Sequence, residues 1–292
     1  MSALKNGSTK TPRAGGEFDI SKITTTAKKL PNRIVIHAKP GWGKTSFAAQ
    51  IPDAIFLMVT DDGLRTLISS GQVQPNIAHF PEMAESLTEI GKAINQLSVH
   101  RHRHKALVID NITGIEMIIH DMVCQKRYGG SWDKFNAYGG EQATKSAATE
   151  WDDILTKLDL LRSCGIGVFL IAHSKVVNFK NPSGPDYDRW IPSISKHSWE
   201  RVNNWADIVL FGDFETTVDK IDISKNDAQT KGKASGGNHR ILLTTHNAAY
   251  DAKNRHGLPE EIDCGSSAVE AWANFRTALT PGINGKSILQ DN

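Results

Sequence analysis

The sequence predicts an α/β fold built on a mainly parallel sheet flanked by helices, with an antiparallel β-hairpin extension at one edge. Short apolar runs alternate with longer segments of helical periodicity, which is typical of βαβ units. Each apolar run is continuous, as expected of strands that are covered on both faces. After residue 212 the segments become polar and β-like, and this change indicates the hairpin extension.

The elements are expected in the following order along the chain. Short apolar runs predict strands at 34–38, 54–60, 105–110, 166–172 and 206–212. Helical periodicity predicts helices at 82–98, 141–163 and 266–279. The hairpin extension is expected from 215–223, 239–246 and 250–255, with a flexible Lys/Gly/Ser-rich tip at 224–238.

The composition is that of a globular chain. Its 292 residues are 39% hydrophobic, carry a formal charge of +2 and include three cysteines without a CxxC pair. A net charge of +2 is too small for the protein as a whole to attract a polyanion, and the cysteine pattern excludes a disulfide framework. No apolar run approaches the roughly 20 residues of a membrane span. We expect a cytoplasmic protein with no membrane partner: a basic flexible arm at 1–30, one domain at 31–280 and a loose tail at 281–292.

A phosphate-binding loop follows the first predicted strand. Residues 38–46 read Ala-Lys-Pro-Gly-Trp-Gly-Lys-Thr-Ser, which fits the P-loop pattern with alanine in the first glycine position. The two glycines let backbone N–H groups turn towards a phosphate. Lys44 is expected to reach the β- and γ-phosphates of ATP, and the Thr45 hydroxyl to hold Mg²⁺. The expected nucleotide-binding residues are Lys39, Pro40, Gly41, Trp42, Gly43, Lys44, Thr45 and Ser46.

Polar residues end three further strands, at the sheet edge where ligands of open α/β folds bind. Asp110 ends the strand at 105–110 and is expected to be the second Mg²⁺ anchor, because its position relative to Lys44 is that of a Walker B residue. Asp61 and Asp62 follow another strand, and one of them is expected to activate water, unless they only form a turn. His173 follows the fourth strand, where it either senses the γ-phosphate or is structural.

Taken in order, these strand ends resemble the RecA-like ATPase core. The segment 250–259, Tyr-Asp-Ala-Lys-Asn-Arg-His-Gly-Leu-Pro, and the long segment after His173 are most similar to the RecA-like single-strand annealing ATPases and recombinases of bacteriophages. The resemblance covers about residues 31–263. Two departures stand out: the family usually has Glu where this chain offers Asp61 and Asp62, and recombinases commonly have Gln at the position of His173.

The resemblance also implies an assembly. RecA recombinases and ring helicases carry a late Lys-x-Lys or Lys-x-Arg element that reaches the nucleotide of the neighbouring subunit, and Lys253 and Arg255 match it. The two residues lie two apart in a predicted strand, so their side chains are expected to leave the same face. A homo-oligomer, ring or filament, with shared ATP sites is therefore expected.

Two polar segments, 126–145 and 175–197, interleave cations with aromatic residues. Cations neutralise phosphates and aromatic rings stack on bases, which suits single-stranded DNA. The resemblance implies that both segments are DNA-binding loops, whereas the alternative is that their aromatic residues anchor them to the domain. The expected DNA-binding residues are Lys126, Arg127, Trp132, Lys134, Lys175, Lys180, Arg189 and Trp190.

The leading hypothesis is an oligomeric, Mg²⁺-dependent ATPase that binds single-stranded DNA and promotes annealing or strand exchange in phage recombination. A single-strand DNA-binding protein is the protein partner considered. The alternatives are a ring helicase or translocase, a small-molecule kinase and a nucleotide-dependent interaction protein with weak hydrolysis. A kinase would need an arginine-rich lid, which 175–197 does not supply, and no helicase N-terminal domain is recognised.

Overall fold

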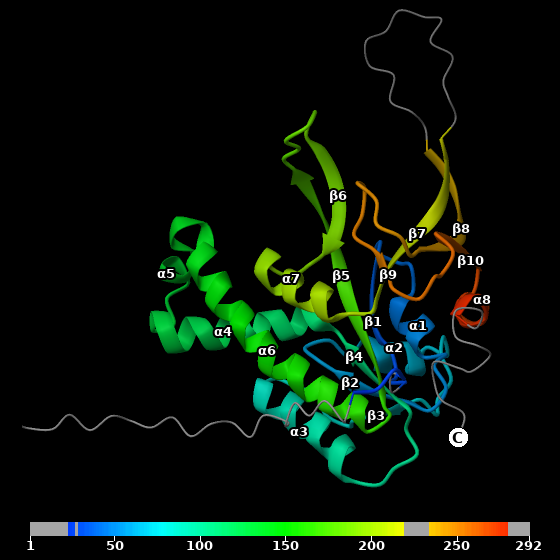
Figure 1. Ribbon diagram of the computed structural model, residues 1–292, viewed down its shortest axis with the longest axis horizontal. Helices are drawn as coiled ribbons and strands as arrows, with labels where there is room; N and C mark the ends of the chain where they lie inside the picture. The colour runs from blue at the N-terminus through cyan, green and yellow to red at the C-terminus, as the bar shows by residue number, and fades with distance from the viewer. Residues whose placement is uncertain (1–22, 27–28, 219–233, 280–292) are drawn as a thin grey trace, which may run out of the picture.

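A central sheet contains the strands that the sequence predicts. The computed structural model describes residues 23–26, 29–218 and 234–279. Neighbouring strands pair in parallel in the order β7-β1-β5-β4-β2-β3 (Figure 1). These strands are β1 (Arg33–Ala38), β2 (Ala54–Met58), β3 (Ala78–His79), β4 (Ala106–Asp110), β5 (Gly167–Phe179) and β7 (Ile208–Val218). The predicted α/β class with a mainly parallel sheet is confirmed.

The antiparallel extension lies at the β7 edge of the sheet. β8 (Ala234–Leu243) pairs with β7, and β10 (Glu261–Gly265) pairs with β8, both antiparallel. The strand expected at 250–255 is reduced to β9 (Lys253–Asn254), which pairs with the first residues of β7. The predicted hairpin is thus confirmed, while most of its expected tip, most of the arm at 1–30 and the tail at 281–292 lie outside the described residues.

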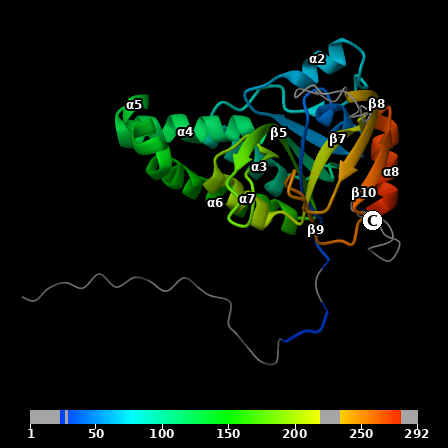
Figure 2. The same ribbon diagram turned by 90° about the horizontal axis from the view of Figure 1, so that it is seen from above.

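Helices cover both faces of the sheet (Figure 2). One apolar cluster joins the sheet to α3 (Leu87–Val99), α4 (Ile112–Tyr128), α6 (Glu141–Ser163) and α7 (Lys196–Trp205). The other joins it to α1 (Lys44–Ala48), α2 (Gly63–Ser69) and α8 (Ala268–Leu279). Consecutive strand residues alternate between the clusters, as with Val35 and Ile36, which explains why each strand is continuously apolar. Among the described helices, none has the length and apolar character that crossing a bilayer requires.

The long segment after His173 is a β-hairpin and not the loop that we expected. β5 continues beyond the sheet to Phe179, and β6 (Tyr187–Pro192) returns antiparallel to it. The turn is closed by an Asx-type bond, in which the Ser183 N–H donates to Asn181 Oδ1 at 3.1 Å. This β5–β6 hairpin projects from the body of the protein in Figure 1.

The segment 126–145 also differs from the expected loop, because it is largely helical. α4 ends at Tyr128 with Gly129 in the left-handed region, and α5 (Trp132–Asn136) and the 3-10 helix η2 (Ala137–Gly140) lead into α6. Phe135 is buried and packs its ring against Tyr128 and Trp132. Figures 1 and 2 both show α5 at the far end of α4, away from the antiparallel edge of the sheet.

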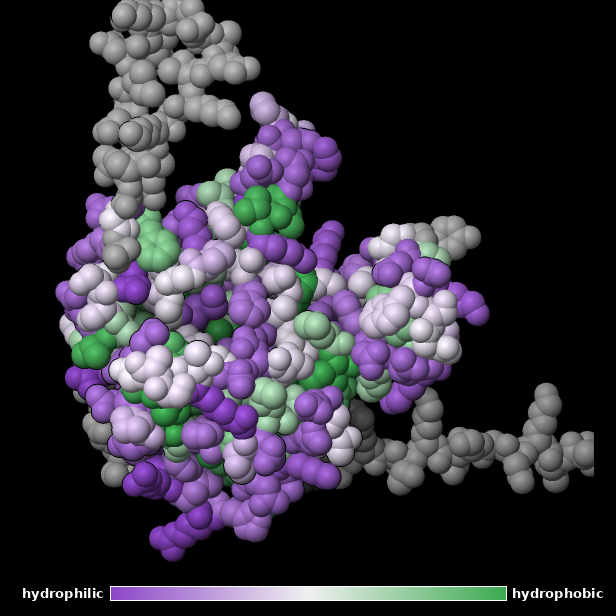
Figure 3. Space-filling model, turned by 180° about the vertical axis from the view of Figure 1, so that it is seen from behind, coloured by the Kyte–Doolittle hydropathy of each residue, from purple (hydrophilic) through white to green (hydrophobic). Residues whose placement is uncertain are grey.

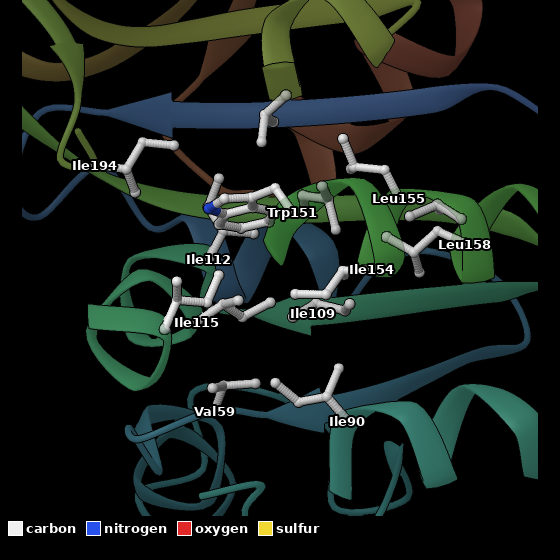
Figure 4. Packing of buried hydrophobic residues seen from close by; sticks show 14 of the residues in the cluster. Val59, Ile90, Ile109, Ile112, Ile115, Trp151, Ile154, Leu155, Leu158 and Ile194 are labelled. Carbon is white, nitrogen blue, oxygen red and sulfur yellow. The ribbon is translucent and has the colours of Figure 1, made fainter. Parts of the chain in front are cut away.

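Glu116 is a buried carboxylate in the packing between α4 and α6. Figure 4 shows this packing around Trp151, whose Nε1 donates to Glu116 Oε2 at 2.8 Å. The Ser195 N–H donates to Oε1 at 3.0 Å, and His120 Nε2 lies 2.9 Å from the same oxygen. Burial raises the pKa of Glu116, but the contacts with His120, Trp151 and Ser195 outweigh it and lower that pKa to about 2.

We expect Glu116→Gln to lower the free energy of unfolding by about 1–3 kcal/mol at pH 7, because the variant loses a charged, hydrogen-bonded buried partner. The pKa is lower in the folded state, so ionised Glu116 stabilises fully above its ordinary value of 4.5 and stabilises less as the pH falls towards 2. Denaturant titrations across this pH range should therefore show the difference from the parent protein shrinking. Glu200→Gln, on the exposed surface of α7, is the control, and a pH-independent difference would contradict the role of the charge.

Candidate nucleotide-binding site

The loop between β1 and α1 contains two glycines in a backbone conformation that other residues rarely adopt. Gly41 and Gly43 have φ values of 79° and 94°, in the left-handed region that favours glycine. α1 begins directly afterwards at Lys44. Lys39, at the start of the loop, does not turn inward, because its Nζ forms an ion pair with Asp213 of β7. The loop is thus held against the antiparallel edge of the sheet.

The backbone of Trp42 is part of this loop, while its side chain is buried in the core. The indole is only 1% exposed, and its Nε1 donates to the carbonyl oxygens of Asp213 at 3.0 Å and Ile241 at 3.2 Å. Gly212 leaves the space for the ring, since a Cβ there would lie 2.7 Å from it. The side chain of Trp42 therefore anchors the loop to β7 and β8.

Asp110 and Thr45 meet as the sequence predicts for a metal site. Asp110 ends β4 beside the loop, and the Thr45 hydroxyl donates to its Oδ2 at 2.6 Å. Burial, with a contribution from the negative charge of Asp61, raises the pKa of Asp110 to about 6 despite the contacts with Thr45 and Lys44. The pKa of Lys44 is lowered by burial, which the charge of Asp110 partly offsets. Both charges are therefore desolvated beside one another.

Asp61 and His173 face each other across the same cleft. His173 Nε2 lies 4.0 Å from Asp61 Oδ2, and Asn111 Nδ2 lies 3.3 Å from the same nitrogen. Burial and the positive charge of Lys44 lower the pKa of His173, against the effect of Asp61. Asp62 differs from its neighbour: it precedes α2 and does not line the cleft.

The cleft has a volume of about 340 Å³ and includes residues that the sequence analysis missed. Asn111 does not line the cleft but contacts His173, which does, and its place directly after the strand that ends in Asp110 was a usable signal. Arg240, from β8, lies 198 residues from Trp42, whose carbonyl oxygen it contacts, and no local pattern indicates that contact. The cleft is lined by Gly41, Trp42, Gly43, Lys44, Thr45, Ser46, Asp61, Leu67, Gln72, Asp110, Ile171, His173, Arg240 and Ala268.

The residues of the cleft fit a magnesium nucleotide. Gly41 and Gly43 have the backbone freedom for inward N–H groups, and Lys44 supplies a cation for the phosphate chain. Mg²⁺ prefers oxygen ligands, and the Thr45 hydroxyl and the Asp110 carboxylate would hold it. When bound, the metal ion would neutralise charge on the phosphate oxygens.

Lys253 and Arg255 are not brought to the cleft of their own chain. β9 pairs with the first residues of β7. These residues lie beside the start of β1, whereas the P-loop follows its end, so β9 is at the opposite ends of the parallel strands from the P-loop. Lys253 Nζ donates to the carbonyl oxygens of Asn203 and Asn204 at the end of α7. The Arg255 side chain is 51% exposed and lies 3.8 Å from Asp207 Oδ1.

Two exposed lysines lie on the β5–β6 hairpin. Lys180, at the turn, has 85% of its side chain exposed and pairs with Asp186. Lys175 lies nearer the body and donates from Nζ to the carbonyl oxygen of Ile194. Figure 3 shows hydrophilic residues over the tip of the projecting hairpin and a hydrophobic patch at its base. Both lysines are accessible to an anionic partner.

The other expected DNA-binding residues of the hairpin pack against the body. Arg189 has only 11% of its side chain exposed, because it pairs with Asp251. The Trp190 ring stacks on Phe211, with 6.2 Å between ring centroids. These contacts hold β6 against the body of the protein.

The remaining expected DNA-binding residues lie far from the hairpin. The exposed Lys126 and Arg127 are in the last turn of α4, and Lys134 and the half-exposed Trp132 are on α5. Figure 1 shows this end of α4 well away from β6. The structure therefore separates the expected DNA-binding residues into two groups.

The parallel sheet, the glycine loop and the Thr45–Asp110 pair together define a P-loop nucleotide-binding protein. A sequence model of the AAA domain family matches residues 30–256, which include β1 through β9. The chain therefore belongs to the AAA domain family. No curated protein matches the chain.

Proposed function

We propose that this protein is an ATPase that binds single-stranded DNA and promotes strand annealing or exchange in phage homologous recombination, in the cytoplasm of the host cell. The observation that carries the proposal is the path of β5. This strand passes the cleft at His173 and continues without a break to Phe179 in the projecting hairpin. A change at the phosphate end of the cleft would therefore act directly on the backbone of an exposed, lysine-bearing hairpin.

The base of the hairpin is held at both ends beside the cleft. The His173 N–H donates to Thr113 Oγ1 at 3.2 Å, and the Ser193 N–H donates to the His173 carbonyl at 2.7 Å. Thr113 belongs to the first turn of α4, directly after the strand that ends in Asp110. These contacts support a connection between the nucleotide and the hairpin.

For hydrolysis, Asp61 is the residue that orients the attacking water. It lines the cleft, whereas Asp62 does not, and it lies beside His173. Lys44 and the backbone N–H groups of the loop stabilise the charge that develops on the phosphate. His173 detects whether the γ-phosphate is present.

The protein works as a homo-oligomer, ring or filament, in which Lys253 and Arg255 serve the nucleotide of a neighbouring subunit. Arg33 already occupies Asp207, with bonds of 2.7 Å and 3.1 Å to its two oxygens. The ion pair between Arg255 and Asp207 is therefore long, and the Arg255 side chain is exposed. Lys253 has less freedom, because it donates to two carbonyl groups at the end of α7.

The experiment that tests this function measures ATP hydrolysis with and without an oligo(dT) single strand. We expect Mg²⁺-dependent turnover that rises several-fold with DNA, while Lys44→Ala gives the background. If the rate of ATP hydrolysis were the same with and without DNA, the favoured function would be a nucleotide-dependent interaction protein. Unwinding of a forked duplex by the same preparation would favour a ring translocase.

We expect the pair Lys175→Ala and Lys180→Ala to weaken oligo(dT) binding about tenfold at low salt. Each lost phosphate contact lowers the slope of log K against log salt by about 0.7, so the slope should become shallower by about 1.4. Fluorescence anisotropy across a salt series measures both quantities. Lys157→Ala, on α6, is the control, because that lysine is also exposed and ion-paired. Binding and slope equal to those of the parent would move the DNA site to the arm at 1–30.

A further inference from the structure

Arg240 links three parts of the chain at the nucleotide cleft. It lies on β8, its Nε donates to the Trp42 carbonyl at 2.7 Å, and its Nη1 donates to the carbonyl of Ser266 before α8. The same side chain lines the cleft that Lys44 also lines. A cation thus connects the P-loop to the antiparallel edge of the sheet and to the turn between β10 and α8.

The bond to Trp42 fixes the direction of one peptide group in the P-loop. The peptide between Trp42 and Gly43 is trans, so its carbonyl and its N–H point in opposite directions. Because the carbonyl is held by Arg240, the Gly43 N–H is directed away from β8. N–H groups of such a loop bind phosphate only when they converge on it, so a fixed peptide improves the site before the ligand arrives.

The guanidinium also brings positive charge to the loop. A Cβ added to Gly43 would lie 3.9 Å from Arg240 Nε and 4.0 Å from Nη2, so the charged group lies directly against the loop. Nε and Nη1 hold the two carbonyl groups, which fixes the plane of the fork and leaves the Nη2 edge next to Gly43. A lysine has one ammonium on a flexible stem and lacks this planar fork.

We propose that Arg240 is a positioning residue for the phosphate chain of the nucleotide, in the same chain as the P-loop. It orients the Gly43 N–H through the Trp42 carbonyl and adds a fixed positive charge to the cleft that Lys44 also lines. The ligand class is a nucleoside di- or triphosphate. The inference rests on the nucleotide site described above and adds a residue to it.

The test compares ATP and AMP binding by calorimetry for the parent chain, Arg240→Ala, Arg240→Lys and His239→Ala. His239 is the matched control, because it neighbours Arg240 on β8 and its ion contact is with Asp263 instead of the loop. We expect Arg240→Ala to bind ATP about ten- to a hundredfold more weakly, with AMP affinity changed less than about threefold. Arg240→Lys should lie between, since it keeps the charge and loses the fork, and His239→Ala should match the parent.

The ratio of ATP to AMP affinity separates positioning from a merely structural role. Loss of stability alone would lower the melting temperature and leave this ratio unchanged in the folded protein, and that result overturns the proposal. If Arg240→Ala does not fold, Arg240→Lys decides: an ATP to AMP ratio equal to that of the parent would reject the inference. A parent chain that binds no ATP would instead reject the nucleotide function itself.

Discussion

Replacing Lys44 with alanine should weaken ATP binding about a hundredfold, which corresponds to a loss of about 3 kcal/mol. The variant leaves the charge of the β- and γ-phosphates uncompensated in a cleft that holds few other cations. The expected effect on stability is different. Burial lowers the pKa of Lys44, so the ammonium is unfavourable in the folded protein without nucleotide. The variant should therefore melt at the same or a higher temperature than the parent.

Calorimetry with ATP and thermal melting of the nucleotide-free protein measure these two effects separately. Lys92→Ala, an exposed lysine on α3, is the matched control and should change neither. Unchanged ATP affinity in Lys44→Ala would reject the P-loop assignment. Weaker binding together with a strongly reduced melting temperature would mean that Lys44 has a structural role, contrary to the pKa argument.

The strands of the sheet could be predicted because their environment is uniform along their length. Val35 and Ile36 face opposite apolar clusters, so every residue of β1 had to be apolar and the run was visible. The same criterion placed the end of the fourth strand at 172, where β5 leaves the covered sheet. From His173 onwards it carries polar residues and is held by β6 instead of by packing on both faces. A search for apolar runs cannot find that half of the strand.

The sequence also contains a local signal for the start of the helix expected at 82–98. The helix expected at 82–98 begins at Leu87, because Ser86 accepts a bond from the Glu89 N–H at 3.2 Å and Glu89 accepts one from the Glu85 N–H at 2.8 Å. Ser86 and Glu89 have the spacing of a capping box, and here the Glu89 carboxylate accepts from the residue just before the N-cap. The sequence therefore held the information for the helix start.

Some residues of the candidate site could be predicted from the strands, and others could not. Lys44 and Thr45 begin the helix after β1 and its loop, and Asp110 ends β4, so the rule that the carboxyl ends of parallel strands meet at one side of the sheet was enough to bring them together. The inward turn of Trp42 and the contact of Arg240 depend on β7 and β8, which pair with or approach the loop only in the folded sheet. Contacts of such long sequence separation leave no periodic signal in the chain.

Arg255 lies at the edge of the sheet opposite to the P-loop, and this geometry bears on whether it acts in its own subunit. β1 runs from the side of the sheet where Arg255 lies to the side where the P-loop lies. Its six residues, at about 3.3 Å each, span roughly 20 Å. An arginine side chain is much shorter than this distance. If Arg255 contributes to hydrolysis, it must therefore serve a neighbouring subunit, and Arg255→Ala and Lys44→Ala would each abolish turnover through different halves of a shared site.

Mixing these two variants under conditions of subunit exchange should therefore restore part of the activity. An interface is complete when the Arg255→Ala subunit gives its intact P-loop and the Lys44→Ala subunit gives its intact Arg255. In a random equimolar mixture about one quarter of head-to-tail interfaces meet this condition, so ATPase activity should return to roughly that fraction of the parent value. The control is Lys44→Ala mixed with the Lys44→Ala/Arg255→Ala double variant, which forms no complete interface. Continued inactivity of the first mixture, with co-assembly demonstrated by a tagged pull-down, would reject the shared site.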